Sequence, residues 1–364
     1  MVKPATHPAA DRRSRLAVID CDIHNALPSE AALLPYLPAR WRRQYELFGL
    51  RGRQGAYYPR MVPHAARTDA WPPSGQPPGS DLTFLREQLL DQYGIEYGIL
   101  NPLIGVGGQL NLEYSAALAR AVNEWQVAEW LEKEPRLRAA IVVPYEDGAL
   151  AAAEVRRAAA HPGFVQVLVL SRTCEPLGRR KYWPLYEAAV ERGLPVGIHF
   201  GGTGAGPITG CGWPSYYIED HVGVAQAMQA QVVSLVCEGV FEVFPSLKVV
   251  LIEGGFAWFP ALMWRLDAAW RRLKEEVPHL RRAPSEYLRT HFWLTTQPME
   301  EPHRPRYFLD ILAQVGVERL MFATDYPHWD FDAPDQALPS GLADKVRRAI
   351  MAENARRLYR LALA

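Results

Sequence analysis

The chain has 364 residues, of which 49% are hydrophobic, 22% charged and 11% aromatic. This composition excludes a collagen-like, coiled-coil or largely disordered protein and indicates a soluble globular one. The 40 basic and 40 acidic residues cancel, so no overall field attracts nucleic acid or anionic lipid. We therefore expect a small-molecule substrate as the partner, and neither nucleic acid nor a membrane.

The cysteines indicate a reducing compartment. Cys21, Cys174, Cys211 and Cys237 lie far apart and form no Cys-x-x-Cys pair, which favours neither a zinc knuckle nor a disulfide framework. Residues 1–15 are polar, and no later segment approaches the roughly 20 apolar residues that cross a bilayer. We expect a cytoplasmic protein in which residues 1–15 form a flexible tail.

Eight short runs rich in Val, Ile and Leu recur along the chain, most of them too continuous for burial on one face only, which is typical of parallel strands. The predicted strands are Leu16–Asp22, Gly94–Asn101, Arg138–Pro144, Phe164–Leu170, Pro195–Phe200, Leu247–Glu253, His291–Thr296 and Arg319–Thr324. The predicted helices are Leu112–Glu132, Gly148–Ala160, Trp183–Arg192, Ile218–Phe241, Trp258–Leu273, Pro305–Val315 and a C-terminal extension, Ala343–Leu363. This alternation predicts a single (β/α)8 TIM-barrel domain over residues 16–364.

Two long segments interrupt the alternation. Residues 23–82, after the first strand, are dense in Pro, Gly and aromatic residues and are expected to form an ordered lid, in which Tyr57, Tyr58 and His64 pack. Gly201–Pro214 follows the fifth strand. Both segments leave the carboxyl ends of strands, where the active sites of barrels form.

Residues suited to metal binding stand at three of these strand ends. The first strand ends in Asp22 and His24, which are two positions apart and so point to the same side of an extended chain. The fifth ends at His199 and the eighth at Asp325. A barrel brings all strand ends to one ring, and paired buried carboxylates are unfavourable without a cation. These residues therefore predict a metal site with two imidazoles and two carboxylates.

Longer motifs surround these positions. They are Asp-Cys-Asp-Ile-His ending at His24, Gly-Ile-His-Phe-Gly around His199, Ile-Glu-Gly-Gly-Phe-Ala-Trp around Glu253, Thr-Gln-Pro around Gln297, and Phe-Ala-Thr-Asp-Tyr-Pro-His-Trp-Asp around Asp325. In this order they resemble the amidohydrolase-related family, in the branch that contains amino-carboxymuconate-semialdehyde decarboxylase. The resemblance runs from about Leu16 to Leu361. It implies one divalent metal held by Asp22, His24, His199 and Asp325.

The expected number and kind of metal ions follow from two positions at which this chain differs from other members of the family. Members that bind two metals bridge them with a carbamylated Lys of the fourth strand, whereas Phe164–Ser171 contains no Lys, so we expect one ion. Asp22 stands where a His is commoner in this branch. Two oxygen and two nitrogen donors shift the preference from zinc towards manganese without excluding zinc. We therefore expect zinc or manganese.

The sixth strand departs more strongly. The decarboxylases of this branch carry a catalytic His at its end, where this chain has Glu253. Glu253 could orient a water, act as a base, or be a structural carboxylate that holds a metal-bound His; ionised, it would repel a substrate carboxylate. His221 either replaces the missing imidazole or is an exposed helix residue. Gln297 is expected to face the site, and His328 to have a structural role at its rim.

These arguments predict a metal-dependent hydrolase of a small cyclic or aromatic amide, ester or lactone that uses a metal-activated water. Asp325 is expected to move the proton, with Glu253 and His221 as further catalytic residues. The alternative is a non-oxidative decarboxylase of an aromatic or muconate-like acid, in which His221 or Glu253 manages the protons. A lesser alternative is an inactive barrel that serves as a binding protein. Because related barrels commonly pair, a homodimer is also expected.

Overall fold

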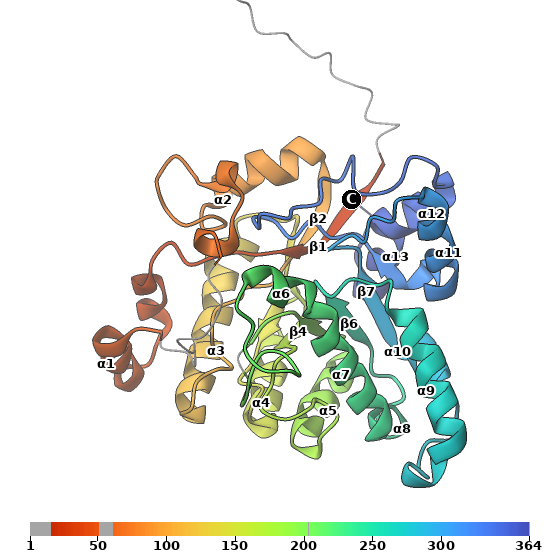
Figure 1. Ribbon diagram of the computed structural model, residues 1–364. Coiled ribbons are helices and arrows are strands. Elements are labelled where there is room, and N and C mark those ends of the chain that lie inside the picture. Colours follow the sequence, from red (N-terminus) through yellow and green to blue (C-terminus); the bar gives the residue numbers. More distant parts are fainter. Residues whose placement is uncertain (1–15, 51–60, 203, 364) are drawn as a thin grey trace, which may run out of the picture.

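The computed structural model describes residues 16–50, 61–202 and 204–363 and confirms the predicted (β/α)8 barrel (Figure 1). Its eight parallel strands pair in sequence order. The strands are β1 (Val18–Ile23), β2 (Ile95–Leu100), β3 (Leu137–Val142), β4 (Phe164–Leu170), β5 (Val196–His199), β6 (Val249–Ile252), β7 (Phe292–Thr295) and β8 (Leu320–Met321). Every residue of β1, β5, β6 and β8 is buried, as expected for parallel strands covered by helices.

Some of the sequence predictions fall on residues whose structure is not described. Residues 1–15, Tyr57 and Tyr58 lie outside the described ranges. His64 is described, and its ring lies 5.4 Å from that of Trp71.

The first strand meets the chain that follows the last strand. The backbone N–H of His24 donates to Tyr326 O at 2.7 Å, and the N–H of Asp325 donates to Asp22 O at 3.1 Å. Residues from the two ends of the chain are thereby brought together at the carboxyl ends of the strands.

The last strand is shorter than the predicted Arg319–Thr324, because β8 ends at Met321. Beyond Met321, the chain bonds at Thr324 to a side chain instead of to the backbone of a neighbouring strand. The N–H and Oγ1 of Thr324 donate to the carboxylate of Asp20 at 3.0 and 2.5 Å. The backbone therefore leaves the regular ladder before it reaches Asp325.

Helices cover the outside of the barrel. They are α1 (Ala39–Phe48), α2 (Leu82–Leu85), α3 (Leu112–Gln126), α4 (Gly148–Ala158), α5 (Trp183–Arg192), α6 (Tyr217–Val222), α7 (Val224–Cys237), α8 (Val240–Val243), α9 (Phe259–Leu273), α10 (Pro284–His291), α11 (Pro305–Val315), α12 (Asp344–Arg348) and α13 (Asn354–Tyr359). The side chains of Asn111 and Asp147 accept N–H groups of the first turns of α3 and α4. These caps explain why both helices begin where they were predicted.

The helix predicted over Ile218–Phe241 is instead three helices, α6, α7 and α8. Gly223 separates the first two and Gly239 the last two. Gly239 has a φ of 75°, a left-handed conformation that glycine adopts without strain. The break after α6 lets this short helix turn towards the carboxyl ends of the strands.

The insertion after β1 has two parts. In the first, α1 lies beside α3 (Figure 1), and the ring of Trp41 packs 5.2 Å from that of Tyr114. In the second, the N–H of Arg67 donates to Pro327 O at 3.0 Å, next to the chain that follows Asp325. This second part borders the site described below.

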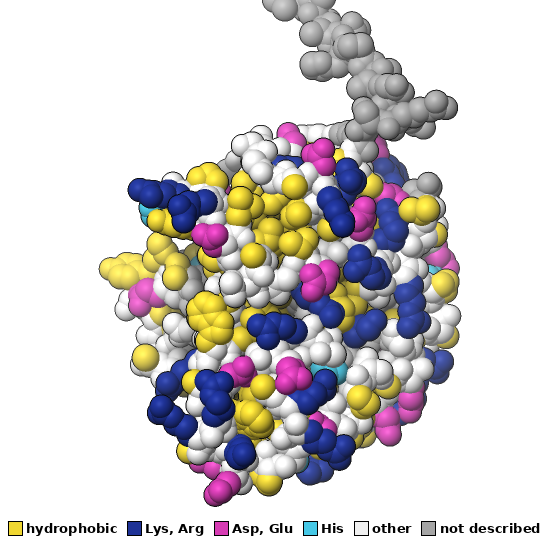
Figure 2. Space-filling model, turned by 90° about the vertical axis from the view of Figure 1, so that its right-hand side faces the viewer, with side chains coloured by type: hydrophobic (Ala, Val, Ile, Leu, Met, Phe, Trp, Pro, Cys, Tyr) yellow, Lys and Arg dark blue, Asp and Glu magenta, His cyan; other side chains and the backbone are white. Residues whose placement is uncertain are grey.

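The face that carries α9 and α11 mixes basic, acidic and apolar side chains (Figure 2). One of the apolar side chains of α9, Trp264, is 58% exposed. Among the described residues, no helix combines the length and the apolar character that crossing a bilayer requires.

Candidate metal centre

Two buried imidazoles at the carboxyl ends of β1 and β5 have one nitrogen already committed. His24 Nδ1 lies 2.7 Å from Asn101 O, and His199 Nδ1 lies 2.6 Å from Phe200 O. A carbonyl oxygen only accepts, so each Nδ1 carries the hydrogen and each Nε2 of a neutral ring offers a lone pair. This arrangement is typical of metal-binding histidines, whose second nitrogen is held by a carbonyl or carboxylate.

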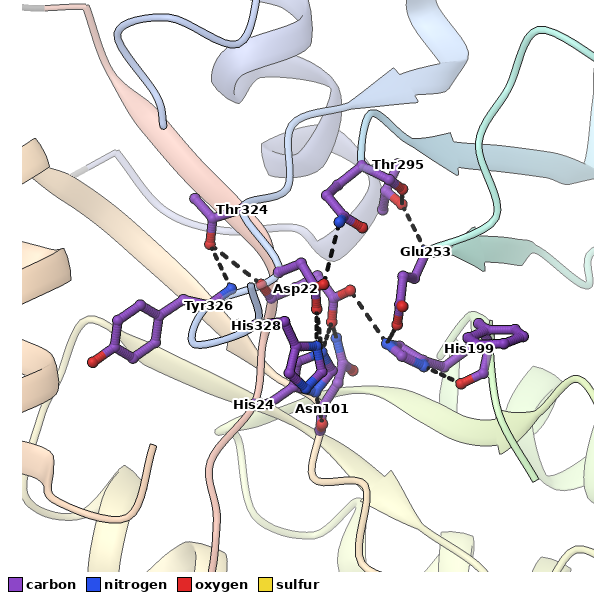
Figure 3. A network of polar contacts seen from close by, with 12 residues as sticks. Asp22, His24, Asn101, His199, Glu253, Thr295, Thr324, Tyr326 and His328 are labelled. Carbon is purple, nitrogen blue, oxygen red and sulfur yellow. Dashed lines mark hydrogen bonds and ion pairs between the residues drawn. The ribbon is translucent and has the colours of Figure 1, made fainter. Parts of the chain in front are cut away.

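Both Nε2 atoms face carboxylate oxygens (Figure 3). His199 Nε2 lies 3.2 Å from Asp22 Oδ2 and 3.1 Å from Glu253 Oε2, and His24 Nε2 lies 3.4 Å from Asp22 Oδ1. The ligand atoms of these four residues lie within 4.8 Å of one another. Lone pairs that face lone pairs in a buried site require a proton or a cation between them. The donor set therefore fits one divalent metal ion.

Asp325 lies beside this group. Its Oδ1 is 2.8 Å from His24 Nε2 and 2.7 Å from His328 Nδ1, and its Oδ2 accepts from Gln297 Nε2 at 3.2 Å. Asp325, His24, His328 and Glu253 form a second group of ligand atoms within 4.8 Å. The structure thus brings the four predicted ligands to one place and adds Glu253 and His328, with Glu253 belonging to both groups.

The pKa values show the charge that the site favours. Burial lowers the pKa of His24, but Asp22 and Asp325 outweigh it and raise the pKa to about 9. Burial, together with Asp325 and Asp22, raises the pKa of Glu253 well above its usual range. The carboxylates thus create a strongly negative environment, in which a positive charge is stabilised.

Asp325 remains ionised in this environment. Burial raises the pKa of its carboxyl, but the imidazoles of His328 and His24 outweigh burial and hold the pKa well below its usual range. Both carboxylate oxygens are already engaged by side chains. This environment favours the ionised form of Asp325, and its role in moving protons stays a prediction.

Both carboxylates that follow strands β6 and β8 have unusual backbones. Glu253 has a φ of 55° and Asp325 a φ of 61°, in the left-handed region that residues with a Cβ seldom adopt. Such conformations persist where the surrounding structure holds them and are common at functional sites. Here the N–H of Glu253 donates to Thr295 Oγ1 at 3.1 Å (Figure 3).

A buried chain of amide side chains supports Asp22. Asn101 Nδ2 donates to Asp22 Oδ1 at 2.9 Å, and Gln166 Nε2 donates to Asn101 Oδ1 at 2.7 Å. Tyr359, in the C-terminal helix α13, donates from its hydroxyl to Gln166 Oε1 at 3.0 Å. The amide of Asn101 and its carbonyl thus hold both residues of the first motif, Asp22 and His24.

His221 reaches the site from α6. Its Nε2 lies 2.9 Å from Asp330 Oδ2, which also accepts from Gln297 Nε2 at 2.8 Å. The hydrogen bond to Asp330 raises the pKa of His221. The His221 side chain is only 14% exposed, so it is not the exposed helix residue that one interpretation expected.

Sequence reasoning passed over three residues of this region. Asn101 and Arg172 follow β2 and β4, so their positions at strand ends were a signal that could have found them. Asp330 occurs in the last motif, yet nothing in the sequence showed that it contacts His221.

Comparison with known proteins extends the picture. The model of the Amidohydrolase family matches residues 19–361. The chain belongs to this family. The predicted family resemblance is therefore confirmed.

Among curated proteins, this chain is similar to gamma-resorcylate decarboxylase from Polaromonas sp. strain JS666. The two are 29% identical over 77% of this chain and 88% of the relative. Among solved structures, an amidohydrolase from Mycobacterium avium subsp. paratuberculosis has a TM-score of 0.72 at 23% identity and covers 94% of this chain and 99% of its own. Dihydroxybenzoic acid decarboxylase from Polaromonas sp. JS666, with bound manganese and the inhibitor 2-nitroresorcinol, has a TM-score of 0.66 at 21% identity over 96% and 98% of the two chains.

The prediction of a hydrolase is wrong. Several curated relatives, among them those from Polaromonas, Rhizobium and Rhodococcus jostii, are named decarboxylases, which favours the alternative interpretation. The argument against decarboxylation assumed that Glu253 is ionised and would repel a substrate carboxylate. In the structure, burial and the neighbouring carboxylates raise the pKa of Glu253, which disfavours the ionised form that this repulsion requires.

Proposed function

We propose that the protein is a metal-dependent, non-oxidative decarboxylase of an aromatic acid that carries a hydroxyl beside its carboxylate. The proposal depends on one observation: in a buried site, His24 Nε2 and His199 Nε2 face carboxylate oxygens of Asp22. This arrangement of donor atoms fits a cation at the carboxyl ends of the strands. The names of the curated relatives support this reaction class.

We propose manganese as the ion, held by Asp22, His24, His199 and Asp325, with Glu253 close enough to complete the ligand set. Carboxylate oxygens combined with imidazoles suit this ion. When bound, the metal would neutralise the carboxylate and hydroxyl oxygens of the substrate. Elemental analysis of untreated protein tests this assignment, with about one equivalent expected.

The chain's own residues would handle the proton. As the carboxylate leaves as carbon dioxide, its bonding electrons stay on the ring carbon, which must gain a proton. We assign this proton to His221, because its hydrogen bond to Asp330 raises the pKa of the imidazole and so favours its protonated form. Glu253 is a less suitable donor, because its Oε2 is turned towards His199 Nε2 at 3.1 Å.

The test uses the manganese-loaded protein and a panel of 2-hydroxybenzoates that includes 2,6-dihydroxybenzoate. We expect release of carbon dioxide and, in deuterated water, one deuterium on the ring carbon that lost it. Metal-stripped protein and His199→Ala should release at most about one hundredth as much. A fully loaded protein that releases no carbon dioxide from any member of the panel would refute the proposal.

Location and assembly are separate proposals. The four free cysteines support the cytoplasm as the compartment. The exposed Trp264 on α9 supports pairing of two copies through the face that carries this helix. Light scattering after size exclusion should then give twice the mass of one chain, and Trp264→Glu should give one.

A further inference from the structure

Arg172, the second residue after β4, has hydrogen-bonding capacity that the described part of the protein does not use. Its side chain is 7% exposed. Nη2 donates to Asp220 of α6. Within the described ranges, however, neither Nε nor Nη1 has a hydrogen-bond partner. Buried donors are rarely left unpaired, so these two nitrogens indicate a missing acceptor.

The guanidinium is fixed next to a predicted metal ligand. Its Cζ lies 4.6 Å from the centre of the Phe200 ring, and Phe200 directly follows His199. The N–H of Ser171, the residue directly before Arg172, donates to His199 O at 2.8 Å. The arginine and the metal centre therefore belong to the same end of the barrel.

Arg172 also borders a cavity of about 110 Å³. The other lining residues come from the chain that follows β2, β3, β4 and β5 and include Gln109, Tyr145 and Glu146, whose carboxylate is paired with Lys181 at 2.7 Å. Apolar cavities of roughly 150 Å³ hold a benzene molecule, so this space is of the order of one aromatic ring. The cavity lies at the same end of the barrel as the metal centre, and none of the predicted ligands lines it, which suits the part of a substrate that points away from the ion.

We propose that Arg172 binds a second carboxylate of the substrate, so that the preferred substrates are aromatic dicarboxylic acids rather than monocarboxylic ones. This inference rests on the proposed decarboxylase function, which places the first carboxylate at the metal. Two carboxylates, Asp22 and Asp325, lie at the metal centre beside the imidazoles, so a second substrate carboxylate would be repelled there. A guanidinium is the side chain best suited to receive it, since charge-assisted hydrogen bonds are the stronger kind.

Asp220 does not remove this capacity. Of the guanidinium nitrogens, it accepts from Nη2 only. Asp220 thus positions the guanidinium and leaves Nε and Nη1 for a ligand.

Binding to the manganese-loaded protein tests the proposal without any turnover. Calorimetry would compare isophthalate and terephthalate, which carry two carboxylates, with benzoate, which carries one. We expect at least one of the dicarboxylates to bind roughly 10- to 100-fold more tightly than benzoate. Arg172→Lys should reduce this ratio to about one, because lysine lacks the fork of donors. Arg180→Lys, which alters an exposed arginine stacked 4.4 Å from Trp183, should keep the wild-type ratio.

A second variant guards against misfolding. Arg172→Gln combined with Asp220→Asn removes both charges of the buried pair and should also lose the preference while keeping the wild-type melting temperature within a few degrees. The proposal is overturned if the wild type shows no preference for either dicarboxylate, or if Arg172→Lys retains it. A clear preference without release of carbon dioxide would instead refute only the decarboxylase function, and carbon dioxide release with no dicarboxylate preference would refute only the role of Arg172.

Discussion

Asn101 holds two of the predicted metal ligands, Asp22 and His24. Its carbonyl holds His24 Nδ1, and its amide group holds Asp22 Oδ1. We expect Asn101→Ala to weaken manganese binding about 10- to 100-fold, as is usual when a supporting partner of a metal ligand is lost. Calorimetric titration with Mn²⁺ measures the effect.

Asn123→Ala is the matched control, because Asn123 is equally buried but donates to Val142 O and Glu154, away from the metal ligands. This variant should lose stability and keep its affinity for manganese. Equal losses of affinity in both variants would contradict the role given to Asn101.

The pair of His221 and Asp330 predicts a pH dependence. The pKa of His221 is raised above its ordinary 6.5, chiefly by the hydrogen bond to Asp330. The pair therefore stabilises the fold fully below pH 6.5 and loses this contribution as the pH rises through the raised pKa. In Asp330→Asn the pKa of His221 should fall, and the alkaline limb of the activity profile should move to lower pH.

Titration of the His221 ring by NMR checks the direction. His161→Gln serves as the control and should leave the profile unchanged. His161 precedes the amino end of β4 and so lies far from the carboxyl ends of the strands. An unaltered His221 titration in Asp330→Asn would show that the hydrogen bond is not the cause.

At the scale of elements, the insertion is tied to the first metal-binding motif through Gly79. The backbone of Gly79 lies directly against that of His24, because a Cβ added to Gly79 would be 2.3 Å from His24 O. Gly79 also has a φ of 75°, and its carbonyl accepts the N–H of Ala26 at 2.9 Å. The end of the insertion and the backbone of His24 therefore cannot move independently.

Gly79→Ala should consequently reduce both stability and manganese affinity. Gly75 offers a matched control, because it has a φ of 74° and nothing within 4 Å of an added Cβ. Gly75→Ala should cost only the strain of the left-handed backbone, about 1–2 kcal/mol, and bind manganese normally. Chemical denaturation and metal titration of both variants would separate strain from the steric clash.

Prediction from sequence succeeded for elements whose signals are local. β4, α5 and α11 have the predicted bounds, since continuous apolar runs, Gly193 after α5 and Pro305 at the start of α11 all act within a few residues. β8 was predicted too long because the bonds that replace its ladder come from Asp20, far away in the sequence. The division after α6 was missed because the apolar pattern continues across Gly223.

The same distinction explains the site. Asp22, His24, His199 and Asp325 stand at strand ends, so topology alone predicts that they converge. Which groups they contact depends on side-chain directions and on backbone conformations such as those of Glu253 and Asp325. The proximity of Glu253 to His199 and the pairing of His221 with Asp330 therefore required the structure.

For the whole molecule, the metal should be a stabilising ligand. An ion that binds only the folded state stabilises it by about 2.7 kcal/mol when its free concentration is 100 times Kd. We expect removal of the metal to lower the melting temperature by several degrees, and Mn²⁺ but not Mg²⁺ at the same concentration to restore it. Differential scanning calorimetry measures both. A melting temperature that does not respond to Mn²⁺ would contradict a metal centre at this site.

The contact of His24 with Asp325 joins residues 301 positions apart. A ribosome adds about 5–20 residues per second, so roughly 15–60 s separate the synthesis of the first motif from that of its counterpart. During this interval the nascent polypeptide has only part of the coordination sphere. We therefore expect insertion of the ion to be one of the last events in the biogenesis of the protein, and a product truncated before the eighth strand to lack the ion.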